Sequence, residues 1–141
     1  MSQTNLDNWH LHLKGEFPGG LDALLHEDCA FYSPIVFTPQ QGKTLTKMYL
    51  QAAGGTFSEG DKEKSPGQKE SAFRYIKEVC SGNEVVLEFE SEIQGKYING
   101  VDIITFDDEG LVTEFKVMIR PLQAVNLMHS QMQAMLESMQ K

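Results

Sequence analysis

Residues 84–119 read EVVLEFESEIQGKYINGVDIITFDDEGLVTEFKVMI, and this stretch decides the fold. It holds three runs rich in β-branched and aromatic residues, separated by Gln94-Gly95 and by an acidic turn that ends at Gly110. Such runs favour strands, and turns this short join neighbouring strands antiparallel. A fourth run, AFRYIKEV, precedes them at 72–79 across the short turn 81–83. The second half of the chain is therefore predicted to be a four-stranded antiparallel meander.

The alternation of side chains along these strands assigns their two faces. In 85–93 the odd-numbered residues are apolar except for Ser91, whereas three glutamates share the other side. Burying three carboxylates would cost several kcal/mol, so we expect the glutamates on the outer face of the sheet. The run 111–120 divides in the same way and places Lys116 and Arg120 on that outer face.

The orientation of strand 97–106 is left open by its sequence. One alternate set contains Asp102 among apolar residues and Gly100, and the other set contains Tyr97 and Asn99. If the first set faces inward, Asp102 is a carboxyl group in an apolar chamber, where it must find a partner or keep its proton. If the other set faces inward, Asp102 is an ordinary surface residue.

The first half of the chain is predicted to contain three helices and one strand. Helical spacing of apolar residues indicates an amphipathic helix over 4–14, and LDALLHED indicates a second helix over 21–28. CAFYSPIVF, at 29–37, has the composition of a strand. A third helix begins near Thr44 and is expected to stop at Gly54-Gly55, where glycine permits a left-handed cap.

Two further segments complete the predicted organisation. Residues 54–71 are rich in Gly, Ser and charge, which indicates a flexible loop. Residues 122–140 indicate a C-terminal helix whose apolar stripe packs on the domain or on a second subunit, and the stripe contains Val125, Met128, Met132, Met135 and Met139. The 141 residues show no internal repeat and suit a single α+β domain, 1–141.

Composition excludes several classes of partner. The formal net charge of −8 disfavours binding to nucleic acid or to an anionic membrane surface. The N-terminus has no apolar run that resembles a signal-peptide core, and no stretch is long enough to span a bilayer. We therefore expect a cytoplasmic protein, in which Cys29 and Cys80 are reduced thiols within apolar stretches.

Motifs for cofactors and metals are missing from the sequence. It has no glycine-rich phosphate loop, no GxSxG and no HExxH. His10 and His12 are two residues apart, which points them in different directions on a helix, and His26 and His129 are isolated. We therefore expect no cofactor and no metal site.

Two segments resemble a known family. LDALLHEDCAFYSPIVFTPQQGK, residues 21–43, resembles the second helix, first strand and following loop of the nuclear transport factor 2-like superfamily. GVDIITFDDEGLVTEFKVMIRP, residues 100–121, resembles its last two strands, and the order of the elements matches throughout. The SnoaL-like branch is the most similar. The resemblance implies a cone-shaped barrel, in which a curved antiparallel sheet wraps around the N-terminal helices and encloses an apolar pocket, and it implies dimers formed through the sheet.

The resemblance also implies that Asp102 faces inward. Steroid isomerases of the superfamily carry an aspartic acid in the corresponding strand, within an I/V-D-x-x-x-F pattern, where it stays protonated and donates a hydrogen bond to an enolate oxygen. Two departures stand out. The basic aspartate that precedes the first-strand proline in those enzymes is Ser33 here, and their donor tyrosine falls at about Trp9. Steroid isomerisation by that route is therefore not expected, because serine needs a base of its own.

Two functions are consistent with the sequence. The first is a pocket for a small apolar molecule, in which Asp102 acts as acid or base in an isomerase or cyclase reaction on a polycyclic or polyketide-like substrate. We expect that pocket to be lined by Trp9, Leu13, Phe31, Ser33, Tyr49, Phe89, Ser91, Ile104, Val117 and Ile119. The second is a non-catalytic binding or assembly module that works through its outer sheet face and C-terminal helix.

Two properties of the folded protein follow as expectations. The inward residues include no Lys or Arg, so burial should raise the pKa of Asp102 above its usual value of about 3.9. The competing hypothesis is that a histidine, with His12 as the nearest candidate, pairs with Asp102 and lowers that pKa. The apolar residues on the outer sheet face predict a homodimer.

Overall fold

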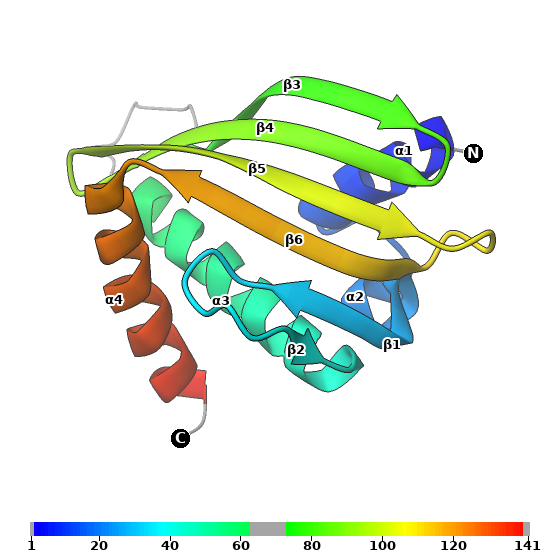
Figure 1. Cartoon of the computed structure of the whole chain (residues 1–141), viewed down its shortest axis with the longest axis horizontal. Coiled ribbons are helices and arrows are strands. Elements are labelled where there is room, and N and C mark those ends of the chain that lie inside the picture. Colours follow the sequence, from blue (N-terminus) through cyan, green and yellow to red (C-terminus); the bar gives the residue numbers. More distant parts are fainter. Residues whose placement is uncertain (1, 63–72, 140–141) are drawn as a thin grey trace.

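The structure, a computed structural model, describes residues 2–62 and 73–139 (Figure 1). Within these ranges four helices and six strands follow one another along the chain. They are α1 (Ser2–Leu13), α2 (Gly20–Leu24), β1 (Leu25–Tyr32), β2 (Gln40–Gln41), α3 (Lys43–Lys62), β3 (Arg74–Ser81), β4 (Glu84–Ile93), β5 (Lys96–Phe106), β6 (Val112–Arg120) and α4 (Leu122–Met139).

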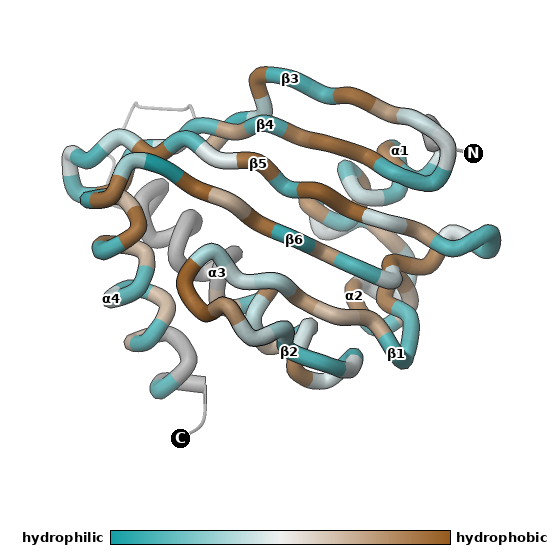
Figure 2. Tube along the Cα trace, viewed as in Figure 1, coloured by the Kyte–Doolittle hydropathy of each residue, from teal (hydrophilic) through white to brown (hydrophobic). Residues whose placement is uncertain are grey.

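The six strands form one curved sheet. Their order is β2-β1-β6-β5-β4-β3, so the predicted meander β3-β4-β5-β6 is confirmed. All neighbours in the sheet are antiparallel except β1 and β6, which pair in parallel. The hydropathy of the chain alternates along the strands, as a sheet with one apolar face and one polar face requires (Figure 2).

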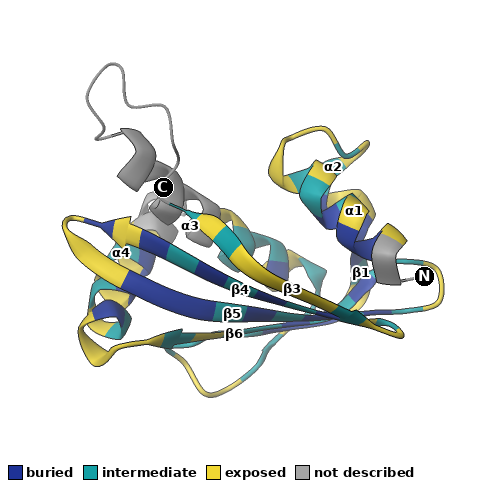
Figure 3. Ribbon diagram, turned by 90° about the horizontal axis from the view of Figure 1, so that it is seen from above, coloured by how far each residue is buried: buried dark blue, intermediate teal, exposed yellow. Residues whose placement is uncertain are grey.

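The helices α1, α2 and α3 lie over the same face of the sheet, which is therefore its inner face (Figures 1 and 3). The helix α4 follows β6 and packs beside α3 at one end of the molecule. Buried positions concentrate in β4 and β5, at the middle of the sheet (Figure 3). The architecture is the α+β cone that the sequence predicts.

Two predicted boundaries near β1 were wrong. The segment 25–28, expected to be helical, is the start of β1, in which Leu25 pairs with Val112 of β6 before the register shifts. The strand expected to run to residue 37 ends at Tyr32. Pro34 and Pro39 lack the N–H group that a ladder needs, and the Ser33 hydroxyl oxygen accepts bonds from the backbone N–H groups of Ile35 and Val36.

The end of α3 was also predicted wrongly. The helix does not stop at Gly54-Gly55 but continues to Lys62. A glycine inside a helix costs about 1 kcal/mol relative to alanine, and packing of α3 against β1 and α4 offsets that cost. The flexible loop predicted for 54–71 therefore overlaps the helix at 54–62, and its remainder, 63–71, lies outside the described residues.

The inner face carries two apolar clusters. The first lies beneath α1 and α2 and includes Leu6, Trp9 and Phe115. The second lies toward α3 and α4 and includes Met128 and Met132, so these two residues of the predicted methionine stripe pack on the domain itself. Met135 and Met139 lie outside the described side chains. Cys29 and Cys80 are free thiols, as expected.

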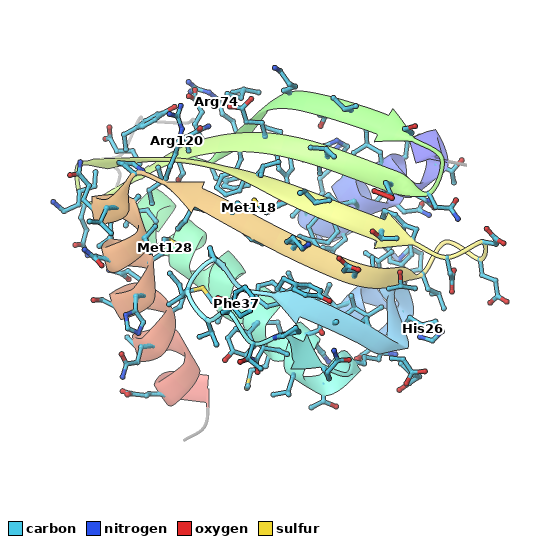
Figure 4. All side chains as sticks on the ribbon, viewed as in Figure 1. His26, Phe37, Arg74, Met118, Arg120 and Met128 are labelled. Atoms are coloured by element: carbon cyan, nitrogen blue, oxygen red, sulfur yellow. The ribbon has the colours of Figure 1, made fainter. Side chains whose placement is uncertain are left out.

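The outer face carries an ion pair between Glu90 and Arg74 and further polar contacts. Glu90 accepts bonds from Arg74 and from Tyr97, and Asn99 joins Glu88 to Arg120 through its amide group, with Arg120 Nε 2.8 Å from Asn99 Oδ1. Arg74 and Arg120 lie on the exposed side of the sheet in Figure 4. No helix in the described part of the chain is long and apolar enough to cross a membrane.

Candidate functional site

The orientation of Asp102 is decided by the register of β5. Asp102 lies opposite Leu87 of β4 and Val117 of β6. Leu87 is fully buried beneath the helices, and residues directly opposite in neighbouring strands share a face. Asp102 therefore points inward, and it is only 7% exposed.

Three side chains form a directed chain of hydrogen bonds at this point. The Trp9 indole Nε1–H donates to the Tyr75 hydroxyl oxygen over 3.0 Å, and the Tyr75 O–H donates to Asp102 Oδ2 over 2.8 Å. The three residues come from α1, β3 and β5, so the chain crosses the inner face from helix to sheet. Because Tyr75 accepts one bond and donates the other, its hydroxyl proton is committed to Asp102.

Burial controls the protonation of this group. Removal from water raises the pKa of Asp102, and the hydrogen bond from Tyr75 lowers it only in part, so that the pKa rises from 3.8 to about 7. Burial and the nearby Asp102 carboxyl raise the pKa of Tyr75 well above its usual value. Tyr75 therefore stays protonated in the physiological range, whereas Asp102 is divided between its acid and its carboxylate near pH 7.

The two histidines of α1 do not bond to Asp102. His10 Nε2 lies 2.7 Å from Glu78 Oε2 at the surface. The His12 ring packs against the Trp9 ring with centroids 5.0 Å apart, and burial lowers its pKa, so it is neutral near pH 7. The partner of Asp102 in the structure is thus Tyr75, and the raised pKa agrees with the first of the two alternatives set by the sequence.

Most of the predicted lining residues lie on or beneath the inner face. Trp9, Phe31, Phe89, Ser91 and Ile104 are buried there, while Tyr49, Val117 and Ile119 are partly buried and pack against the apolar clusters. Two predicted members do not fit. Leu13 is 46% exposed at the end of α1, and the hydroxyl oxygen of Ser33 holds the loop after β1.

Tyr75 is the functional residue that sequence reasoning missed. The run 72–79 was predicted as a strand, but its faces were not assigned. Tyr75 lies opposite Phe89, an inward residue, and the register shifts between Tyr75 and Lys77. If strict alternation is continued past Ile76, the remaining residues of β3 are therefore assigned to the wrong faces of the sheet. The sequence does not mark this shift: without it, the regular pairing that begins at Ser81 and Glu84 would place Tyr75 opposite Glu90, an outward residue.

The inner face beside Asp102 is incompletely covered. Val117 of β6 lies directly opposite Asp102. Its strand is flanked by β1 and β5, yet the Val117 side chain is only partly buried. Ile119 of β6, Tyr49 of α3 and Tyr75 of β3 are also only partly buried. Apolar inner-face residues with exposed surface around a buried carboxyl group are the arrangement expected of a ligand site. Within the described ranges, no group of three or more His, Cys, Asp or Glu residues is arranged to hold a metal ion.

Comparison with solved structures identifies the family. A steroid delta-isomerase from Pseudomonas aeruginosa is 30% identical to this chain and superposes with a TM-score of 0.81, covering 97% of this chain and 92% of its own. An NTF2-like protein of unknown function from Mesorhizobium loti is 14% identical, with a TM-score of 0.63 over 85% of this chain and 93% of its own, and shares the fold. The chain belongs to the nuclear transport factor 2-like superfamily.

Some of the similar structures belong to proteins whose function is unknown. An uncharacterised protein with a cystatin-like fold from Silicibacter pomeroyi is 30% identical to this member, with a TM-score of 0.67 over 81% of this chain and 72% of its own. No family model matches the chain, and no curated protein matches it. The relatives thus support the fold, and one of them is a steroid delta-isomerase. They assign no role to any residue of this chain.

Proposed function

We propose that this member of the superfamily binds a small, mainly apolar molecule against the inner face of its sheet, with Asp102 as the acid–base group. The observation that carries the proposal is the buried carboxyl group itself. Asp102 has a pKa of about 7, one oxygen fixed by Tyr75, and no other hydrogen-bond partner among the described residues.

The protonated form of Asp102 is a directed donor. Oδ2 accepts the Tyr75 hydrogen bond, so the proton of the acid is placed on Oδ1, which is free to meet a ligand oxygen. A carbonyl oxygen that gains negative charge during enolisation becomes a stronger acceptor, and a donor held in an apolar site then stabilises the transition state more than the ground state. An isomerisation or ring closure of a polycyclic or polyketide-like ketone uses such a group.

The basic aspartate of the steroid isomerases is replaced by Ser33 in this chain, and this limits the chemistry that we propose. The Ser33 hydroxyl oxygen already accepts two backbone hydrogen bonds, and a neutral hydroxyl does not remove a proton from carbon. Asp102 does not donate to the ketone oxygen and remove a carbon proton in the same step. The proposal assigns it the hydrogen bond to the oxygen when it is protonated, and the role of base when it is a carboxylate, in which case the proton it takes from carbon is returned to the product. Similarity to a steroid delta-isomerase supports the class of ligand, an apolar molecule with a ketone.

Binding of ketones is expected to depend on pH. Titration of steroids and polyketide-like aromatic ketones, followed through the fluorescence of Trp9, the single tryptophan, should show affinity at pH 6 that falls about tenfold or more by pH 9. The reason is that the carboxylate formed above pH 7 has no proton to donate.

A matched pair of variants separates the site from general effects. Asp102→Asn keeps a donor at all pH values, so its affinity should no longer vary between pH 6 and pH 9. Asp28→Asn makes the same chemical change at an exposed position of β1 and should behave as wild type. Equal pH dependence in all three proteins, or no binding by wild type, would contradict the proposal.

We also propose that two copies of the chain pair through the outer sheet face, where apolar side chains are exposed. Met118 is 52% exposed, and Tyr97 and Val79 are each 49% exposed on that face. Light scattering at micromolar concentration should give twice the 15.9 kDa mass of the chain. A stable interface of this kind buries about 1,600 Å². Met118→Glu should restore the single-chain mass, and a wild-type mass of 15.9 kDa would exclude the dimer.

A further inference from the structure

Trp9 occupies a fixed position on the inner face of the sheet. It is only 4% exposed, and it comes from α1, which packs against β3 and β4 (Figure 1). Its ring contacts two others, because the centroid of the Phe115 ring is 5.1 Å away and that of the His12 ring is 5.0 Å away. Close-packed neighbours leave a buried indole little room to rotate. The packing of α1 on the sheet therefore sets the direction of the Trp9 N–H group.

This N–H group is already used inside the protein. An indole has one polar hydrogen and no acceptor, and Trp9 donates that hydrogen to the Tyr75 hydroxyl oxygen over 3.0 Å. The sequence places Trp9 at about the position where steroid isomerases have a donor tyrosine. In this chain the donor at that position bonds to another side chain, so Trp9 offers a ligand only its apolar ring.

The bond from Trp9 determines what the Tyr75 hydroxyl group can do. Of the two groups bonded to this oxygen, the indole cannot accept a proton, whereas Asp102 Oδ2, 2.8 Å away, can. A hydroxyl that accepts one hydrogen bond also becomes a stronger donor, because successive bonds polarise one another. Burial and Asp102 raise the pKa of Tyr75 overall, and the Trp9 bond acts in the opposite direction. The Trp9 bond thus strengthens the bond from Tyr75 to Asp102.

We propose that Trp9 is a positioning residue that acts on Asp102 through Tyr75: its N–H group holds the Tyr75 hydroxyl as a donor to Oδ2 and so leaves Oδ1 to the ligand. The role of Oδ1 rests on the proposed function, but the hydrogen-bond chain exists without a ligand and can be tested without one. A carboxylate gains more from a strong donor than a neutral acid does. The chain should therefore lower the pKa of Asp102, against the effect of burial.

The pKa of Asp102 is a direct readout of this chain of bonds. Its shift has two causes, burial and the Tyr75 bond. Among the other titratable groups of α1 and β3, His10 and Glu78 pair with each other, with Nε2 2.7 Å from Oε2. Burial lowers the pKa of His12, which is neutral near pH 7. The residues directly opposite Asp102 in β4 and β6 are apolar.

The test measures the Asp102 pKa by carbon NMR of its carboxyl group, whose signal is assigned by its loss in Asp102→Asn. Tyr75→Phe should raise this pKa by about one unit, the contribution of one hydrogen bond to a carboxylate. Trp9→Phe should raise it by about 0.3–0.5 unit, because Tyr75 remains but is polarised less. In the Tyr75→Phe background, Trp9→Phe should raise it no further.

Two further proteins separate the N–H group from the packing of the ring. Phe115→Leu changes the packing around Trp9 but keeps its N–H group, and it should leave the Asp102 pKa unchanged. Benzothienylalanine in place of Trp9, the single tryptophan, replaces the N–H group by sulfur in a ring of the same shape. It should raise the Asp102 pKa as Trp9→Phe does, and it decides the question if Trp9→Phe does not fold.

Two results would overturn the inference. An unchanged or lowered Asp102 pKa with benzothienylalanine means that Trp9 only packs, and an effect of Trp9→Phe that persists in the Tyr75→Phe background means that Trp9 does not act through Tyr75. The proposed function is tested separately by calorimetric titration with steroid ketones. The pH at which affinity falls should rise with the Asp102 pKa of each variant. Wild type that binds no ketone contradicts the proposed function, whereas the pKa comparison still decides the role of Trp9.

Discussion

Replacement of Asp102 by asparagine is expected to stabilise the protein above neutral pH and to destabilise it near pH 4. The folded protein holds the proton of Asp102 up to about pH 7, whereas the unfolded chain releases it near 3.8. The cost of this group is therefore absent below 3.8, grows as pH rises, and is complete above about pH 7. It amounts to roughly 4 kcal/mol at 1.36 kcal/mol per pKa unit.

Asparagine removes that cost but adds an amide N–H without a described partner, which costs about 1–3 kcal/mol. We expect Asp102→Asn to gain about 1–3 kcal/mol in free energy of unfolding at pH 9, measured by urea denaturation across the pH series. The matched Asp28→Asn variant should show no such gain. A loss of stability in Asp102→Asn that grows with pH would contradict the direction of the Asp102 pKa shift.

Alanine at Gly100 is expected to destabilise the protein by about 3 kcal/mol, which is at the upper end of overpacking effects. A Cβ at this position would lie 2.5 Å from Phe89 Cζ, 2.7 Å from Ile119 Cγ2 and 2.7 Å from the backbone oxygen of Met118. The side chains can move, but the oxygen belongs to the neighbouring strand and moves only with it. Urea denaturation at pH 6 measures the effect, because the Asp102 cost is smaller there than above pH 7.

A second variant separates the two kinds of contact. In the double variant Phe89→Leu, Gly100→Ala, the ring no longer meets the new methyl group, but the contact with Met118 O remains. Gly100→Ala should therefore lower the free energy of unfolding by less in the Phe89→Leu background than in wild type, but it should still lower it. A single Gly100→Ala variant within 0.5 kcal/mol of wild type would show that the strands separate more easily than the register suggests.

The sequence predicted the meander because its signals are local. Short glycine turns and regular alternation need no knowledge of distant segments, and the outer position of the β4 glutamates follows from charge alone. The inward position of Asp102 needed more than alternation, since both faces of β5 are largely apolar. Similarity to a family chose between them, and the register with the buried Leu87 gives the physical reason.

The failures have tertiary causes. Residues 25–28 are helix-like in sequence, yet they belong to β1, which pairs with the distant strand β6 at Leu25 and again at residues 30–32. Gly54 and Gly55 are poor helix residues that α3 nevertheless contains. Tyr75 was missed because the register shift next to it breaks the alternation on which faces were assigned. The first two depend on neighbours far away in the sequence, and the third depends on an irregularity in the pairing of β3 with β4.

The parallel pairing of β1 with β6 bears on how the chain reaches its native state. Phe31 lies beside Phe115, so the contact closes a loop of 84 residues, the difference between 115 and 31. The hairpins from β3 to β6 form between nearby residues, but the sheet stays incomplete until this distant contact is made. Loop-closure entropy opposes such contacts, and they slow folding. During synthesis, β1 cannot pair with β6 until β6 has left the ribosome. The apolar residues of β1 stay exposed to water until that strand arrives.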